Sequence, residues 1–297
     1  MPDPVPPAAD LDLRLVRYFT AVADHGHFGR AAAALHVGQP SLSRQIRHLE
    51  KQLGARLIDR GPQGSRLTEA GEVFLPRAKA LLHSATLAAA TTRAAAQPDR
   101  ITIGYTSDLI VTTAVREMRR RHPTADVHTL HLSWNQPSAA LLDHQVDVAV
   151  ARLPFPTDQL HVTALYDEPR VVVVPVHHRL AGKESVTLAD IADEPTPRLP
   201  DEAWNAFWRV DPRPDGSPAP DGPLVVAVED KLELIAGGQA VSIAPDSLHS
   251  HGLRPDLTTI PLRDVEPGHV VLATRSDDHR HLVAAFREIG ETHLTRP

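Results

Sequence analysis

Arginine, lysine and serine side chains recur on one side of the segment from Gln39 to Leu53. At 100° per residue, Leu42, Ile46 and Leu49 form an apolar stripe, and the polar side chains fall on the remaining surface. Guanidinium groups can fork onto guanine edges, and hydroxyls can bond bases or phosphates. The candidate DNA contacts of this segment are Gln39, Pro40, Ser41, Ser43, Arg44, Arg47 and Lys51. An amphipathic helix with a merely solvated outer face explains the pattern equally well.

Charge is distributed unevenly along the 297 residues. Residues 1–98 hold twelve Lys or Arg against eight Asp or Glu, whereas residues 99–297 hold nineteen against twenty-nine. A small basic module joined to a larger acidic one predicts a polyanionic partner for the first module only.

Two helices and a hairpin are expected around the basic segment. Apolar residues recur at helical spacing over 15–22 and again over 28–35, and glycines separate the three helices. Two short strands around the polar turn at 61–64 predict a hairpin of the kind called a wing. Together these elements predict a winged helix-turn-helix. The further candidate DNA contacts are Arg30, Arg60 and Arg66.

Three runs in this module carry a family resemblance. HVGQPSLSRQIRHLE at residues 36–50, LGARLIDR at 53–60 and LTEAG at 67–71 resemble the DNA-binding region of LysR-type transcriptional regulators. Gly29 and Gly38 depart from the pattern, because the family usually has a hydroxyl residue at both positions. Each departure removes a potential helix cap and a potential phosphate contact.

An alanine-rich segment, residues 68–97, follows the wing. It predicts a helix of about 43 Å, within which Pro76 removes one hydrogen bond. Its apolar positions at a 3–4 spacing are Phe74, Ala78, Leu81, Ala85 and Ala88. The resemblance implies that this stripe pairs with a second copy, giving a homodimer or a dimer of dimers; packing against the same chain is the alternative.

Residues 98–297 show alternating strand and helix patterns, which predict an α/β domain with a parallel sheet. The layout resembles the effector-binding region of the same family, itself similar to two-lobed periplasmic binding proteins. The expected domains are a winged helix-turn-helix at 11–67, a linker helix at 68–97 and an effector domain at 98–297. Lobe I is placed at about 100–161 and 269–297, and lobe II at about 162–268.

Ligands of open α/β sheets bind at the carboxyl ends of strands. Thr106 and Ser107 end the first strand of the domain, and we expect a helix to begin there whose free N–H groups favour an anion. By resemblance, the two lobes would add further residues to the same site. The candidate effector contacts are Thr106, Ser107, Trp134, Arg152, Arg198 and Pro200. Helix capping and local ion pairs explain each of these residues singly as well.

Other classes of site find little support in the sequence. Cysteine is absent, which excludes disulfides, thiolate catalysis and zinc sites built on cysteine. The eighteen histidines lack zinc-type spacing, and no catalytic motif or long apolar span appears. We therefore expect a cytoplasmic protein with no catalytic residues, no metal and no cofactor besides a small-molecule effector.

The sequence thus predicts a DNA-binding regulator of LysR type, not an enzyme. It would bind promoter DNA as a dimer or tetramer and respond to a small acidic metabolite between its lobes. The alternative is a solute-binding protein or an enzyme that uses the same two-lobed fold.

Overall fold

The structure, a computed structural model, describes residues 10–61, 64–225, 228–250 and 252–295. The side chains of Arg60, Val228, Glu229, His249 and Ser250 lie outside this description. The chain divides into two compact units, a helical unit (Met1–Arg93) and a two-lobed unit (Ala94–Pro297).

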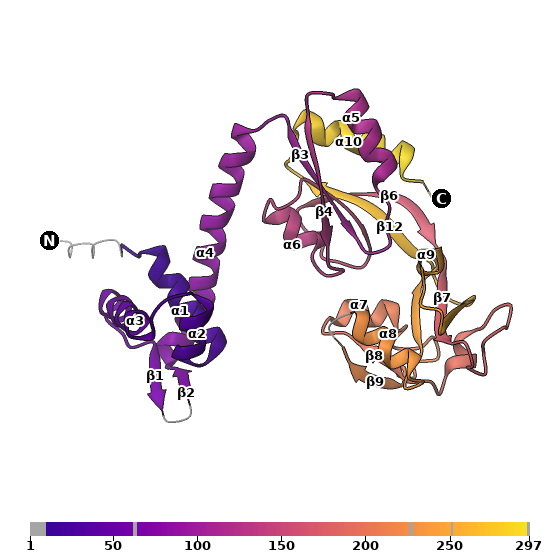
Figure 1. Cartoon of the computed structure of the whole chain (residues 1–297), viewed down its shortest axis with the longest axis horizontal. Helices are drawn as coiled ribbons and strands as arrows, with labels where there is room; N and C mark the ends of the chain where they lie inside the picture. The colour runs from indigo at the N-terminus through magenta and orange to yellow at the C-terminus, as the bar shows by residue number, and fades with distance from the viewer. Residues whose placement is uncertain (1–9, 62–63, 226–227, 251, 296–297) are drawn as a thin grey trace. The chain divides into compact units, whose positions relative to one another are not determined.

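The helical unit is a winged helix-turn-helix, as the sequence predicts (Figure 1). Its helices are α1 (Leu13–His25), α2 (Phe28–Ala34) and α3 (Gln39–Leu53). The antiparallel wing consists of β1 (Ile58–Gly61) and β2 (Gly64–Leu67), with Ile58 opposite Leu67. The core is formed by the apolar stripes of the three helices, including Phe19, Leu42, Ile46 and Leu49, each at most 1% exposed.

The ends of these helices have specific local causes. Asp12 caps α1 by accepting the backbone N–H of Arg14 at 2.8 Å. The imidazole of His27 caps α2, because its Nδ1 accepts the N–H of Gly29 at 3.0 Å. Gly26 and Gly54 end α1 and α3 in the left-handed region, at φ 61° and 68°, which glycine adopts without strain.

The long helix α4 (Glu69–Ala96) follows the wing. Its first part packs on the core of its own unit: Ala78 is fully buried, and the ring of Phe74 lies 5.2 Å from that of Phe19. Phe74 and Ala78 therefore do not belong to an exposed pairing stripe, contrary to the sequence-based prediction. Leu81 and Ala88 remain exposed, and Ala85 is half-buried.

Lobe I of the two-lobed unit contains a five-stranded sheet in the order β4-β3-β5-β12-β6. Its strands are β3 (Arg100–Thr106), β4 (Asp126–Leu132), β5 (Val148–Arg152), β6 (Leu160–Glu168) and β12 (Gly268–Arg275). The helices are α5 (Thr112–Arg121), α6 (Pro137–Leu142) and α10 (His281–His293). Residues of α5 and α10, including Met118 and Phe286, cover one face of the sheet, and α6 packs through Leu141 in a second cluster.

Lobe II contains a three-stranded antiparallel sheet in the order β10-β7-β11. Its strands are β7 (Arg170–Pro175), β10 (Ser242–Pro245) and β11 (Leu257–Pro261), and a parallel pair is formed by β8 (Thr196–Arg198) and β9 (Asp221–Leu224). The helices are α7 (Glu202–Trp208), α8 (Val228–Ala236) and α9 (Ser247–Ser250), with a 3-10 turn at Leu188–Ile191. The side chains of β7 alternate between the two apolar clusters of the lobe.

The border between the lobes differs from the sequence-based prediction. The prediction starts lobe II at residue 162, but β6 pairs with β12 along its length inside the sheet of lobe I. The chain therefore crosses between β6 and β7, near Pro169. Local hydrophobicity does not reveal this border, because strand pairing with a segment a hundred residues away decides it.

Candidate functional site

The outer face of α3 presents three cations to solvent. Arg44, Arg47 and Lys51 are exposed, whereas Leu42, Ile46 and Leu49 on the opposite side are buried. The side chains of Arg44 and Lys51 form no hydrogen bond or ion pair with any residue that the structure describes. The guanidinium Nε of Arg47 donates to the Ser43 carbonyl at 3.4 Å, within its own helix. The two unpaired cations are therefore free to bind a polyanion.

Ser43 does not belong to this face. Its exposed fraction is 8%, so the packing of the helical unit covers most of the residue. The helical wheel places Ser43 on the flank of the polar side, and only the packing of the neighbouring helices decides on which side of the border a flanking residue falls. Gln39, Pro40 and Ser41, at the start of α3, are all exposed.

The beginning of α3 leaves its backbone groups free. Gly38 provides no side-chain hydrogen bond to the helix, as the missing hydroxyl predicts. The free N–H groups of a helix N-terminus favour an anion such as a phosphate.

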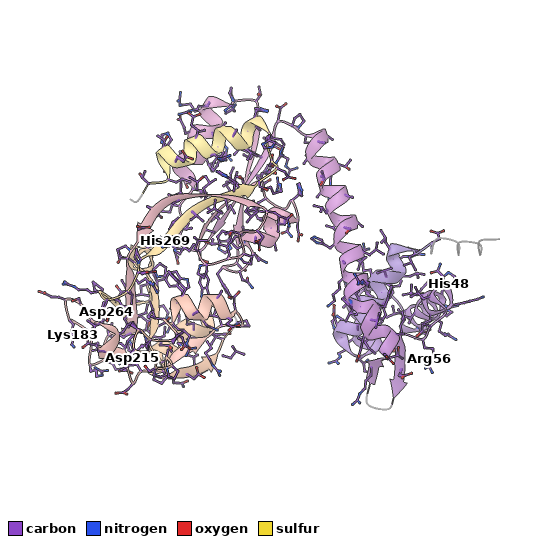
Figure 2. The ribbon with its side chains drawn as sticks, turned by 180° about the vertical axis from the view of Figure 1, so that it is seen from behind. His48, Arg56, Lys183, Asp215, Asp264 and His269 are labelled. Carbon is purple, nitrogen blue, oxygen red and sulfur yellow. The ribbon has the colours of Figure 1, made fainter. Side chains whose placement is uncertain are left out.

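The other basic side chains of the helical unit differ in whether they have a hydrogen-bond partner. The guanidinium of Arg30 donates to the His25 carbonyl at 2.7 Å, and Arg66 on β2 is exposed without a described partner. The side chain of Arg60 lies outside the described residues. Two basic side chains not among the predicted contacts, His48 on α3 and Arg56 after it, are also exposed (Figure 2).

The single acidic residue of α3, Glu50, is directed toward the wing. Its Oε1 accepts the backbone N–H of Leu57 at 2.8 Å and that of Ile58 at 3.2 Å. Glu50 thereby ties the end of α3 to β1 and keeps its negative charge away from the outer face. No local pattern in the sequence links Glu50 to the wing, so this role was not predictable from residue spacing.

The two-lobed unit contains a cavity of about 90 Å³ to which both lobes contribute. Lobe I supplies Thr106, Ser107, Asp108, Trp134 and Arg152. Lobe II supplies mostly apolar side chains and one cation: Val173, Trp204, Trp208, Lys231, Leu232, Ile235, Ala244, Pro245 and Leu248. The cavity therefore has a polar side and an apolar side.

Four of the six predicted effector contacts line this cavity, namely Thr106, Ser107, Trp134 and Arg152. Arg198 does not line it; it donates to the Gly222 carbonyl at 3.1 Å and pairs with Asp221 at 3.4 Å. Pro200 lines a separate, more open depression near Arg209.

The guanidinium of Arg152 is already engaged by protein groups. It pairs with Glu168 at 2.7 Å and donates to the Ser107 carbonyl at 2.7 Å and to the Ser247 hydroxyl at 2.8 Å. Burial alone would raise the pKa of the Glu168 carboxyl, but the bonds from Arg152 and Ser247 outweigh it and lower that pKa. Arg152 therefore has little capacity left for a ligand.

The expected helix start at Thr106 is wrong. Helix α5 begins at Thr112, and the segment before it includes Asp108 at φ 63°, a strained value for a residue other than glycine. The sequence-based argument for an anion at this helix terminus therefore does not hold. The unpaired positive charge at the cavity comes instead from Lys231 of α8, which no sequence pattern singles out.

All three tryptophans of the chain line the cavity. The rings of Trp134 and Trp204 lie 4.7 Å apart, and those of Trp204 and Trp208 lie 5.5 Å apart. Because Trp134 comes from lobe I and the other two from lobe II, this cluster spans the two lobes at the cavity. The indole Nε1 of Trp208 is buried and has no hydrogen-bond acceptor in the described structure.

Metal clusters and membrane-spanning helices are both absent from the part of the chain that the structure describes. No group of three or more described His, Cys, Asp or Glu side chains is placed to hold a metal ion. No described helix is both long and apolar enough to cross a membrane.

Two protein families match the sequence. Residues 13–72 match the family described as a bacterial regulatory helix-turn-helix protein of the lysR family, and residues 95–294 match the LysR substrate binding domain. The first match covers α1 to the start of α4, and the second covers both lobes.

Relatives of known name match over most of their length. The chain is 29% identical to the transcriptional regulator AlsR of Bacillus subtilis, covering 96% of this chain and 97% of AlsR. It is 29% identical to the regulator BenM of Acinetobacter baylyi, covering 86% of each chain. A crystal structure of full-length CbnR complexed with its target DNA is similar at a TM-score of 0.53 and 25% identity, covering 96% of this chain and 100% of CbnR. The chain belongs to the LysR family of transcriptional regulators.

Proposed function

We propose that α3 enters the major groove of duplex DNA, with Arg44 and Arg47 at base edges and Lys51 at the phosphate backbone. The observation that carries this proposal is the exposed cationic face of α3, whose one acid, Glu50, is turned toward the wing. Arg66, exposed on the wing, reaches the neighbouring minor groove. The CbnR relative, solved with its target DNA, supports the same use of the helical unit.

Fluorescence anisotropy with a labelled duplex tests this interface. The duplex is the intergenic DNA upstream of the gene that encodes this chain, and a scrambled duplex measures nonspecific binding. Replacing both Arg44 and Arg47 by alanine is expected to weaken specific binding by roughly 100-fold, because a good arginine–base contact contributes about 1–3 kcal/mol. Replacing Lys51 by alanine should make the slope of log affinity against log salt shallower by about 1, because one phosphate is no longer neutralised.

Arg14→Ala is the matched control, because Arg14 is exposed on α1 and its side chain pairs, among the described residues, with the neighbouring Asp12 alone. This variant retains wild-type affinity. Unchanged specific binding by the double arginine variant contradicts the proposed interface.

We further propose that a small acidic metabolite binds in the cavity between the lobes and changes the affinity of the protein for DNA, with no chemical conversion of the metabolite. Thr106, Trp134 and Lys231 line this cavity from both lobes, so an occupant contacts both and favours one arrangement of them. Ligand binding raises the unfolding temperature in a screen of small carboxylates. The same ligands then shift the anisotropy titration; turnover of a bound ligand would instead support the enzyme alternative.

The exposed part of α4 offers a surface for a second copy of the chain. Leu81 is 37% exposed, and Ala88, about two turns further along the same side of α4, is also exposed. Phe74 and Ala78 instead pack in the core of the helical unit. We therefore restrict the proposed pairing stripe to Leu81, Ala85 and Ala88. Sedimentation velocity of Leu81→Arg should show smaller assemblies than the wild type, whereas Ala90→Arg, half a turn around α4, should not.

A further inference from the structure

Lys231 is the unengaged cation among the described side chains that line the cavity. Its ammonium forms no hydrogen bond or ion pair with any described residue, while all three guanidinium nitrogens of Arg152 are occupied. A half-buried ammonium without a paired anion is poorly compensated unless an anion joins it. The cavity is therefore prepared for one negative charge at Lys231.

The charges around Lys231 support this interpretation. Burial lowers the pKa of the Lys231 ammonium, and the carboxylate of Asp108, the nearest opposing charge, offsets only part of that effect. Asp108 is not within ion-pair distance of Lys231 in the described structure, and Glu168 is bound to Arg152. A bound carboxylate would supply the missing counter-charge directly.

Two further donors belong to residues that line the cavity. Trp208 is 5% exposed, and its indole N–H has no acceptor among the described residues. Thr106 is 5% exposed, and no described residue bonds its hydroxyl. An occupant with an acceptor oxygen near Thr106 would give that hydroxyl a partner, whereas the indole N–H of Trp208 is fully covered.

The size and lining of the cavity limit the rest of the ligand. Its volume of about 90 Å³ is smaller than the roughly 150 Å³ cavity that accommodates benzene. Beyond Lys231, lobe II contributes apolar surface from Trp204, Leu232 and Ile235. A short alkyl group fits this space, and a second carboxylate would find no unengaged cation among the described lining residues.

We propose that the cavity binds a short-chain monocarboxylate, whose carboxylate pairs with Lys231 and whose alkyl group lies against Trp204 and Leu232. This inference rests on the proposed function of the cavity as the effector site, and it names the chemical class of the effector and the residue that selects it. Lys231 sets the preference for one negative charge, and the tryptophan cluster sets the limit on size.

Tryptophan emission of the full-length protein gives a direct test, because all emitting residues line the cavity. The probes are propionate, its uncharged isostere propionamide, the dicarboxylate succinate and the larger benzoate, with sodium chloride holding ionic strength constant. We expect propionate to change the emission saturably. Propionamide, succinate and benzoate should each bind at least about tenfold more weakly. Propionamide lacks the charge, succinate has a second carboxylate for which the described lining offers no unengaged cation, and benzoate exceeds the space.

Lys231→Met retains the length and apolar stem of the side chain and removes the charge. We expect it to weaken propionate binding by at least about tenfold while the circular dichroism spectrum stays unchanged. Lys183→Met is the matched control, because Lys183 lies on the surface of lobe II, paired with Asp190 at 2.8 Å (Figure 2). That variant should bind propionate like the wild type.

Three results overturn the inference: no saturable response to propionate, equal binding of propionamide, or wild-type affinity of folded Lys231→Met. Tighter binding of succinate or benzoate than of propionate overturns the assignment to a short monocarboxylate. Anisotropy with the upstream duplex separates the two proposals. If propionate binds through Lys231 but leaves DNA affinity unchanged, the inference stands and the effector function fails; if another ligand alters DNA affinity and propionate does not bind, the reverse holds.

Discussion

Arg152 and Glu168 form an ion pair inside the two-lobed unit, with Arg152 Nε 2.7 Å from Glu168 Oε2 and both side chains at most 6% exposed. Ser247 joins the pair from lobe II, since its hydroxyl accepts from Arg152 and its N–H donates to Glu168 at 3.1 Å. The ion pair therefore links the lobes close to the point where the chain crosses between them.

Replacing Glu168 by glutamine should destabilise the protein strongly. The change leaves the Arg152 guanidinium buried without its counter-charge, and breaking such a buried pair typically costs about 3–5 kcal/mol. Urea unfolding measures the loss. Glu233→Gln, which breaks an exposed contact with Arg254, is the control and should cost less than about 1 kcal/mol. Equal small losses in both variants would show that the Arg152–Glu168 pair contributes little.

Replacing Lys231 by methionine should stabilise the ligand-free protein. Burial lowers the pKa of Lys231 from its ordinary value of 10.5, which means that the folded state disfavours the charged ammonium. The unfolded chain therefore binds the proton more tightly, and wild-type stability rises as the pH increases from the folded pKa toward 10.5. Thermal unfolding should show a higher melting temperature for Lys231→Met, with a difference that shrinks at high pH; a lower melting temperature at neutral pH contradicts the prediction.

Asp278 should make the stability of the two-lobed unit depend on acid pH. Burial alone would raise its pKa, but the hydrogen bond from Arg280 and the charges of Arg280 and Arg275 lower it to about 2, from the ordinary 3.8. The resulting stabilisation is present above pH 3.8 and is lost as the pH falls toward 2. Its size is about 2 kcal/mol.

Urea unfolding of Asp278→Asn against the wild type checks this dependence. The variant should be less stable at pH 6, and the difference should diminish between pH 4 and pH 2. Asp193→Asn, at an exposed site, should show a small difference that does not vary with pH. A gap for Asp278→Asn that stays constant down to pH 2 would refute the role of its charge.

Replacing Glu50 by glutamine should weaken the attachment of the wing to α3. The Glu50 carboxylate accepts two backbone N–H groups, from Leu57 and Ile58, and hydrogen bonds to a charged acceptor contribute about 1.5–3 kcal/mol each. Glutamine retains one acceptor oxygen, so we expect a loss of about 1–2 kcal/mol. Hydrogen exchange at Leu57 and Ile58 should accelerate relative to Glu72→Gln, an exposed control on α4. Unchanged exchange at both amides argues against this role.

The local elements of the helical unit were predictable from residue spacing. The period of Leu42, Ile46 and Leu49 indicates which side of α3 is buried, and the glycines indicate where helices end. Such signals act within one or two turns of chain, so the sequence alone was sufficient for the winged helix-turn-helix and for the exposure of Arg44 and Arg47.

Contacts between distant segments decided the rest. Ser43 lies at the edge of the polar side of α3, and helix packing placed it inside. Phe74 and Ala78 follow the same spacing as Leu81, yet the core of the helical unit covers only the first two.

The lining of the cavity combines residues that a sequence rule brings together with residues that only the tertiary structure brings together. Thr106 and Arg152 are the last residues of β3 and β5 in one sheet, so a topological rule brings them to one edge. Lys231 of α8, Trp134 of lobe I and the Trp204–Trp208 pair of α7 come from three separate segments, and no local spacing connects these segments. The sequence by itself determined which elements form and which faces of them are apolar. Only the tertiary structure decided which charge finds a partner, because pairing depends on side chains brought together by folding: Arg152 meets Glu168, and Lys231 is left with none among the described residues.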